Sequence, residues 1–304
     1  MKDFIIIGIG PAGLAASIYA SRYNLDVLVL GEENGGCMNE SYNIENYPGF
    51  SSISGFELGQ KMKEHADKLG GKIKQEKVTE LEKIEGGFKV STNTEEYQAK
   101  RVLLATGTVF RKLGISGEDK FSGHGVSYCA TCDGPFFKEK KVAVVGGGNS
   151  ALNAALLLSK YAKEVKIFFR ADKSTAIPRY LKQVEAKDNI ELVPKTNLLE
   201  IKGSQKVEKI VLDNAWKKSR EHQFDGVFVE IGSRPDNAIF KDLSLELDKM
   251  GYIVVNKDQS TSVEGLFAAG DITDNSNGYR QIITACSEGA IAVAAINDLV
   301  QNDK

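Results

Sequence analysis

Two cysteines separated by two residues, Cys129 and Cys132, are the residues of this chain best suited to chemistry, and Asp133 follows them directly. Thiols at this spacing can close a small disulfide that reduction opens again, and a thiolate is the attacking species in disulfide exchange. Glycine-rich runs of the type that binds dinucleotides stand on both sides of the pair, at residues 8–13 and 146–151. Because a bound dinucleotide is a source of electrons, the pattern indicates a redox role for the two cysteines.

A zinc half-site and a pair of inert buried thiols are the alternatives to redox chemistry. A zinc knuckle needs a second cysteine pair, and Cys37 and Cys286 stand isolated from each other. The histidines of the chain show no metal-binding spacing. We therefore predict a redox pair and no metal site.

The first glycine-rich run, Gly8-Ile9-Gly10-Pro11-Ala12-Gly13, lies in the setting that a dinucleotide site requires. The pattern around it predicts a strand, a helix and a second strand at residues 4–8, 13–20 and 26–30. Glu32 and Glu33 follow the second strand, where a carboxylate can accept hydrogen bonds from ribose hydroxyls and would repel a 2′-phosphate. The expected ligand is FAD or NAD.

The same pattern recurs around the second run, Gly146-Gly147-Gly148-Asn149-Ser150-Ala151. It predicts a strand, a helix and a strand at residues 141–145, 151–159 and 165–169. Two such units in one chain predict an α/β protein with two doubly wound, Rossmann-like nucleotide-binding domains. Near the C-terminus we expect a strand at 252–255 and a long helix from about Gln281.

The order of these segments predicts that the second domain is inserted into the first. We expect a discontinuous first domain of residues 1–113 and 243–304, and an inserted domain of residues 114–242 that carries the cysteine pair. The glycines within residues 114–125 are typical of a flexible connection.

Size and charge narrow the functional classes. At 304 residues the chain exceeds one ordinary core. Its 39 lysines and arginines nearly balance 41 aspartates and glutamates, so we expect neither nucleic acid nor a membrane as a partner. Met1-Lys2-Asp3 leads directly into a strand without a signal peptide, and the richest apolar run, 290–296, is too short to cross a bilayer. We expect a cytoplasmic protein.

The segment 261–271 separates FAD from NAD. It ends in Ala269-Gly270-Asp271 and resembles the segment by which flavin disulfide reductases bring an aspartate to the ribityl chain of FAD. FAD is therefore the cofactor that we expect.

In the order of its motifs, nearly the whole chain resembles the low-molecular-weight thioredoxin reductases. The matching motifs, in order, are Gly8–Gly13, Gly35-Gly36, Ile44–Gly49, Ala105-Thr106-Gly107, Cys129–Asp133, Gly146–Ala151, Gly270-Asp271 and Arg280-Gln281. The resemblance implies a homodimer that reduces thioredoxin, with an FAD domain made of both chain ends and the redox disulfide on the inserted domain.

The same resemblance assigns roles to individual residues. Cys132 is the sulfur on the flavin side, Cys129 attacks the disulfide of the partner, and Asp133 donates and accepts the proton. The positions that it assigns to the cofactor are Gly8, Gly10, Pro11, Ala12, Gly13, Gly31, Glu32, Gly36, Cys37, Asn46, Val78, Ala105, Thr106, Gly107, Gly270, Asp271, Arg280, Gln281 and Ile282.

The chain departs from the family at the second glycine-rich run. Relatives that use NADPH have a histidine and two arginines after the next strand and another arginine soon after, which clamp the 2′-phosphate. This chain has Phe169-Arg170-Ala171 and Thr175 there, and Asn153-Ala154 replaces a usual pair of glutamates. An NADH site would need an acid at the strand end, and the nearest is Asp172.

Two explanations of this departure remain open. One is an NADPH site of weakened affinity. The other, which we favour, is a reductase that takes electrons from another donor, in the manner of flavin thioredoxin reductases that use reduced ferredoxin. A second departure is Cys37, which stands where the family normally has a glutamine that reaches the flavin, and a thiol cannot replace the hydrogen bonds of an amide.

Other functions of the same architecture also remain. A flavin-dependent ferredoxin–NADP reductase lacks a redox cysteine pair, so Cys129 and Cys132 argue against it. In a dithiol oxidase the cysteine pair would take electrons from a dithiol, and the enzyme would deliver them to oxygen. A flavin-bound redox sensor is the non-enzymatic alternative.

Overall fold

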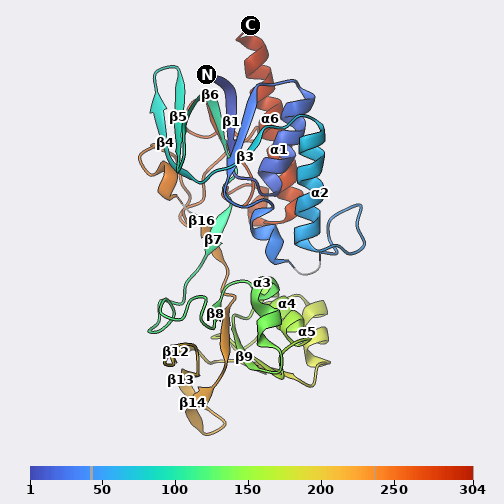
Figure 1. The fold of residues 1–304 in the computed structure, drawn as a ribbon, viewed down its shortest axis with the longest axis vertical. Coiled ribbons are helices and arrows are strands. Elements are labelled where there is room, and N and C mark those ends of the chain that lie inside the picture. Colours follow the sequence, from blue (N-terminus) through green and yellow to red (C-terminus); the bar gives the residue numbers. More distant parts are fainter. Residues whose placement is uncertain (42–43, 236, 304) are drawn as a thin grey trace. The chain divides into compact units, whose positions relative to one another are not determined.

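The computed structural model describes residues 1–41, 44–235 and 237–303 and divides the chain into two compact units. Unit 1 comprises residues 1–109 and 234–304, and unit 2 comprises residues 110–233 (Figure 1). Residues 234–242, which the sequence analysis assigned to the inserted domain, fall in unit 1 because Phe240 is buried there in one core with Ile253.

Unit 1 is built on a twisted sheet whose central strands are parallel. Among the described residues it has seven strands, in the order β3-β2-β1-β6-β5-β4, with β17 also paired to β6. Their bounds are β1 (Lys2–Ile7), β2 (Val27–Gly31), β3 (Ile73–Gln75), β4 (Val78–Ile84), β5 (Gly87–Thr92), β6 (Glu96–Leu104) and β17 (Leu266–Ala268). β4 and β5 pair with each other antiparallel, whereas the pairs β1–β2, β1–β6 and β6–β17 are parallel. This arrangement confirms the predicted α/β class.

Three helices pack beside one another in unit 1 (Figure 1). They are α1 (Pro11–Arg22), α2 (Gly55–Lys68) and α6 (Ile282–Asn302). The alanine-rich face of α1 and the small residues of α6 share one core with β1 and β2. Gly289 makes this packing close, because a Cβ there would lie 2.2 Å from the carbonyl oxygen of Ala12.

Helix α6 corrects one expectation from the sequence. With 21 residues it is, by length and composition, long and apolar enough to cross a membrane, whereas we expected no apolar segment of that length. The helix packs on α1 and buries Ala292, Val293 and Ile296 in the core. Buried core helices can have the same length and composition, so these two properties give no indication of a membrane.

Unit 2 contains a second parallel sheet. Its order is β11-β10-β9-β15-β8, with bounds β8 (Val126–Ser127), β9 (Lys141–Val145), β10 (Glu164–Phe168), β11 (Ile190–Val193) and β15 (Gly226–Val229). Helices α4 (Asn149–Leu158) and α5 (Pro178–Glu185) pack with it. A three-stranded antiparallel sheet follows, formed by β12 (Leu198–Lys202), β13 (Lys209–Trp216) and β14 (Ser219–Gln223). The short segments β7 (Thr108–Phe110) and β16 (Ser233–Pro235), which lead into and out of the unit, pair with each other.

Residues 114–125 are not a flexible connection. The carboxylate of Glu118, which is 2 % exposed, accepts hydrogen bonds from the backbone N–H groups of Leu113 at 2.8 Å and Gly114 at 2.7 Å. Phe121 is buried in the core of unit 2. The glycines here allow the tight turns of a packed segment, since Gly117 and Gly125 have positive φ angles of 88° and 114°.

The predicted strand at 252–255 was also wrong. Within it Ile253 makes only isolated bridges, to Leu247 and Thr273. Its side chain is nevertheless fully buried. The apolar pattern therefore reported burial correctly, but burial of a short segment does not require a ladder of hydrogen bonds.

The close contact between α6 and α1 leads to a first prediction. Replacing Gly289 by alanine at an ordinary helix position would stabilise the helix by about 1 kcal/mol. Here the added methyl group must push α6 away from the carbonyl of Ala12, and overpacking of this kind costs roughly 1–3 kcal/mol. We expect the midpoint of thermal unfolding to fall by several degrees, measured by circular dichroism. Ser287→Ala, an exposed neighbour on the same helix, is the control. An unchanged or raised midpoint in Gly289→Ala would show that the helices separate freely.

Candidate active site

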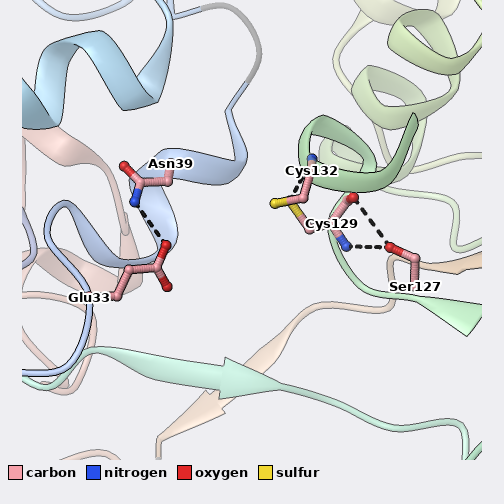
Figure 2. Close-up of a disulfide and its surroundings, with 5 residues drawn as sticks. All are labelled: Glu33, Asn39, Ser127, Cys129 and Cys132. Atoms are coloured by element: carbon pink, nitrogen blue, oxygen red, sulfur yellow. Dashed lines mark hydrogen bonds between the residues drawn. A yellow bond between two sulfur atoms is a disulfide. The ribbon is translucent and has the colours of Figure 1, made fainter. Parts of the chain in front are cut away.

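The cysteine pair of unit 2 is closed as a disulfide, with its Cα atoms 5.4 Å apart. Cys129 caps the short helix α3 (Ala130–Asp133), and its sulfur accepts the backbone N–H of Cys132 at 3.1 Å. The hydroxyl of Ser127 accepts the N–H of Cys129 at 3.1 Å and donates to its carbonyl at 3.2 Å (Figure 2). The backbone on both sides of Cys129 is therefore fixed.

These contacts make the two sulfur atoms unequal. Once the disulfide is reduced, the N–H directed at the Cys129 sulfur would stabilise negative charge on it, which favours the thiolate that exchange requires. Cys132 is the more exposed of the two residues. Asp133 ends α3, half-buried, with its N–H bonded to the carbonyl of Cys129 at 3.1 Å. The three predicted catalytic residues thus lie within one helical turn.

In unit 1 the first glycine turn connects β1 to α1. Gly10 caps α1 without a side chain and Pro11 takes its first position, so the free backbone N–H groups of the helix face the turn. Gly8 has a φ of 118°, and a Cβ on it would lie 2.1 Å from the carbonyl oxygen of Ala105. The structure therefore brings Ala105, and with it Thr106 and Gly107, to the first turn as predicted neighbours.

Two other predicted glycines lie at the same turn. A Cβ on Gly31 would meet Ile9 at 2.8 Å, and one on Gly36 would come within 3.5 Å of the Cα of Gly10. The hydroxyl of Thr106 is buried and has no hydrogen-bond partner. A cradle of side-chain-free backbone, a helix N-terminus and an unpaired buried hydroxyl fit the pyrophosphate and polar groups of a flavin dinucleotide.

The two carboxylates after β2 take different partners. Glu32 pairs with Lys77 at 3.0 Å, directly before the predicted cofactor residue Val78 at the start of β4. Glu33 accepts a hydrogen bond at 3.0 Å from the side-chain amide of Asn39, which also donates to the carbonyl of Asn34 at 2.7 Å (Figure 2). The sequence analysis placed only Glu32 at the cofactor. The structure shows that Glu33 is the carboxylate oriented by an amide at the turn.

The C-terminal segment contributes an aspartate to unit 1. Burial raises the pKa of Asp271 to about 6, although the positive charge of Arg280 opposes the shift and the negative charge of Glu288 adds to it. The guanidinium of Arg280 lies 3.6 Å from the ring centre of Tyr252 and donates to the backbone carbonyl groups of Asp271 and Thr273. Arg280 therefore shapes the turn around Asp271.

Asn46 and Gln281 lie far apart in the sequence and meet in the structure. The amide of Asn46 donates to the side-chain oxygen of Gln281 at 2.8 Å. Gln281 also begins α6 through a reciprocal cap with Thr284, directly before Ile282. The two predicted cofactor residues thus support each other at the N-terminus of the helix.

The two free cysteines differ in their surroundings. Cys37 is exposed, and its thiol donates to the carbonyl of Thr108 at 3.4 Å. Cys286 donates to the carbonyl of Pro11 at 3.6 Å, and burial raises the pKa of its thiol to about 11. A thiol with that pKa is protonated at neutral pH, so Cys286 is a packing residue behind the first turn.

The second glycine turn, in unit 2, is crossed by the segment that follows β10. The hydroxyl of Ser174 and the N–H of Thr175 both bond to the carbonyl of Gly147, at 2.6 and 2.9 Å. The side chain of Asp172 forms an exposed ion pair with Lys195 at 2.8 Å. The turn is well formed, but this loop carries neither the clustered arginines for a 2′-phosphate nor an acid directly at the end of β10 for ribose hydroxyls.

Comparison with known proteins agrees with this geometry. The family described as pyridine nucleotide-disulphide oxidoreductase matches residues 2–289. The chain is 42% identical to a thioredoxin reductase of Treponema pallidum over 99% of this chain and 98% of the relative. The chain belongs to this family. It is a flavoenzyme similar to the low-molecular-weight thioredoxin reductases, which confirms the predicted resemblance and enzyme class.

Solved structures extend the comparison to the fold. The enzyme matches the thioredoxin reductase of Lactococcus lactis with a TM-score of 0.93 at 35% identity, covering 99% of this chain and 100% of the other. It also matches a ferredoxin-flavin thioredoxin reductase of Clostridium acetobutylicum with a TM-score of 0.54 at 35% identity, covering 99% and 98%. The prediction of two Rossmann-like domains is confirmed.

The unpaired hydroxyl of Thr106 yields a second prediction. Thr106→Val removes a buried group that has no partner, so the apoprotein should unfold at the same temperature or slightly higher. The flavin should bind several-fold more weakly because one hydrogen bond to it is lost, which a flavin titration of the apoprotein measures. Thr106→Ser keeps the hydroxyl and should bind like the parent. Equal affinity in Thr106→Val would show that the hydroxyl does not face the cofactor.

Proposed function

We propose that the enzyme reduces the disulfide of thioredoxin through bound FAD and the Cys129–Cys132 pair, and that its electrons come from reduced ferredoxin rather than NADPH. The observation that carries the proposal is the closed disulfide on α3, whose Cys129 sulfur already accepts a backbone N–H. The enzyme acts as a cytoplasmic homodimer, in keeping with the thioredoxin reductases that it resembles.

The residues of the first turn support FAD as the flavin. The glycines between Gly8 and Gly13 and the N-terminus of α1 would hold the pyrophosphate, and Thr106 and Asp271 would bind polar groups of the flavin half. A carboxylate after β2 would hold the adenosine ribose. Bound FAD would supply the electron pair that opens the disulfide.

The reduced pair then carries out two exchange steps. The Cys129 thiolate attacks one sulfur of the thioredoxin disulfide, forms a mixed disulfide and releases the other thioredoxin sulfur as a thiolate. The Cys132 thiolate then attacks the Cys129 sulfur, which restores the enzyme disulfide and releases the second thioredoxin thiolate. One electron pair and no net atom pass to thioredoxin. Asp133, next to Cys132, would deliver and take up the proton of the flavin-side thiol.

The second glycine turn supports a donor other than NADPH. A 2′-phosphate is usually held by several planar guanidinium groups, and this loop offers Arg170 alone among the family positions. Ala171 and Thr175 replace two of the arginines, and Asp172 brings a negative charge that Lys195 balances. A structural relative of 35% identity is named a ferredoxin-flavin thioredoxin reductase, which supports the proposal of such a donor.

The exchange steps predict opposite behaviour of two cysteine variants. Both Cys129→Ser and Cys132→Ser should lose turnover while keeping their flavin, because neither can close the disulfide. The test substrate is a thioredoxin whose first active-site cysteine carries thionitrobenzoate in a mixed disulfide. Only Cys132→Ser should release thionitrobenzoate from it, measured by absorbance at 412 nm, because Cys129 is the attacking thiol. Cys286→Ala should keep full turnover. Capture by Cys129→Ser instead would reverse the two roles, and full activity of Cys132→Ser would end the proposal.

The donor is tested by the colour of the flavin. Under anaerobic conditions we expect reduced ferredoxin to bleach the flavin absorbance rapidly, and NADPH and NADH to do so slowly or not at all. A variant that restores two arginines, Ala171→Arg with Thr175→Arg, should gain response to NADPH because both positions are exposed on the loop. Rapid bleaching of the parent by NADPH would remove the ferredoxin assignment. Oxygen consumption with small dithiols would instead indicate an oxidase.

A further inference from the structure

Helix α6 of unit 1 contains a buried carboxylate that the sequence analysis did not single out. Glu288 is only 4 % exposed. One of its oxygens accepts the backbone N–H of Gly270 at 2.7 Å and lies 3.3 Å from the hydroxyl of Thr273, which shares its one hydrogen with the carbonyl of Gly270 at 3.0 Å. The other accepts the hydroxyl of Ser276 at 2.5 Å. All three donors belong to the segment 270–276, which begins with the predicted cofactor motif Gly270-Asp271.

A buried carboxylate is expensive to desolvate, so its hydrogen bonds must be strong and well directed. Here the three donors are neutral groups from a single turn. Gly270 has a φ of 83°, and that turn has little regular structure of its own, since Ser276 and Asn277 also have positive φ angles. The bonds to Glu288 therefore add to those of Arg280 and of the backbone in holding a segment that secondary structure does not fix.

The position of Glu288 connects this turn to the first glycine turn. Its neighbour Gly289 packs on the carbonyl of Ala12, and a Cβ on Gly270 would lie 3.0 Å from the Cβ of Ala12. The segment 270–276 and the fingerprint of residues 8–13 thus meet at one point on α6. Asp271 emerges from the turn beside this point, with Arg280 bonded to its carbonyl.

We propose that Glu288 is the positioning residue that holds the segment 270–276 against the first glycine turn and so fixes Asp271 for binding FAD. The inference rests on the proposed function, because FAD is the ligand that Asp271 would meet. Glu288 does not touch the cofactor itself. It acts through the N–H of Gly270 and the hydroxyls of Thr273 and Ser276.

Two substitutions separate shape from charge. In Glu288→Gln the amide oxygen can still accept from Gly270 and Thr273, and the amide nitrogen can donate to the hydroxyl of Ser276. Glu288→Leu is close in size but leaves the N–H of Gly270 buried and unpaired. Asp298→Asn removes a carboxylate from the exposed side of the same helix and is the matched control.

The experiment is a titration of each apoprotein with FAD, with amide hydrogen exchange measured on the FAD-free proteins. We expect Glu288→Leu to raise the dissociation constant of FAD about tenfold or more and to lose protection at Gly270. Glu288→Gln should stay within about threefold of the parent and keep that protection, and Asp298→Asn should be unchanged. Parent-like affinity in Glu288→Leu overturns the inference. A loss in Glu288→Gln as large as in Glu288→Leu also overturns it, because charge would then matter more than shape.

A second variant covers the case in which Glu288→Leu does not fold. Ser276→Gly removes one of the three donors, and the positive φ of that residue suits glycine. Its dissociation constant for FAD should rise about threefold, and a value equal to that of the parent overturns the inference. If the parent apoprotein takes up no FAD, the proposed function fails instead. If the parent binds FAD and Glu288→Leu binds it equally well, only the role of Glu288 fails.

Discussion

The contact between α6 and the first glycine turn is the constraint on which unit 1 depends. Backbone meets backbone there, because Gly289 has no side chain that would separate the helix from the carbonyl of Ala12. The contact joins the two ends of the chain across an insertion of more than a hundred residues. Asp271 and Gln281 belong to the C-terminal segment, which also contacts the rest of unit 1 through the pairing of β17 with β6 and the bond between Gln281 and Asn46. The proposed dinucleotide site therefore draws its residues from both ends of the chain.

The glycine turn of unit 2 resembles that of unit 1 in its backbone but differs in the side chains beside it. Gly146 has a φ of 141°, and a Cβ on it would lie 2.2 Å from the carbonyl of Glu230, much as Gly8 approaches Ala105 in unit 1. The two turns are thus equally well formed as backbone. They differ in the side chains that follow the second strand, which are carboxylates in unit 1 and a single family arginine with an ion-paired aspartate in unit 2. The difference that bears on the proposed choice of ligand therefore lies in those side chains and not in the glycines.

The parts of the fold that were predictable from sequence are those where a local pattern and a tertiary requirement coincide. The strand at 141–145 matches β9 in both bounds, because a β-branched run leading into a glycine turn suits a buried parallel strand. The first helix and strand differ from prediction only at their ends. The strand at 252–255 failed because its apolar residues are buried without a partner strand, which periodicity cannot reveal.

The side chains of the site were less predictable than its backbone. Glycine spacing located the turns, since close approach leaves a mark in the sequence. Glu288 left only a weak signal, a carboxylate in an apolar stretch of the helix, and its partners lie 12 to 18 residues away. Asn39, which orients Glu33, was missed for the same reason. Hydrogen bonds between separate segments depend on the packed structure, and one sequence does not display them.

The chemistry of the disulfide is separable from the source of its electrons. The groups that form hydrogen bonds with Cys129 belong to residues 127–133 and are the hydroxyl of Ser127 and the backbone N–H groups of Cys132 and Asp133. The groups that would select a nicotinamide cofactor lie on the second turn and on the loop after β10. The two sets are connected by apolar packing, in which Ala130 of α3 shares a core with Ala151 and Leu152 of α4. Under the proposed mechanism, side chains on the loop can therefore change the electron donor while the Cys129 sulfur keeps its N–H partner. Such separation predicts what the chain contains: a cysteine pair with its hydrogen-bond partners in place, and a loop after β10 that lacks most of the family arginines for a 2′-phosphate.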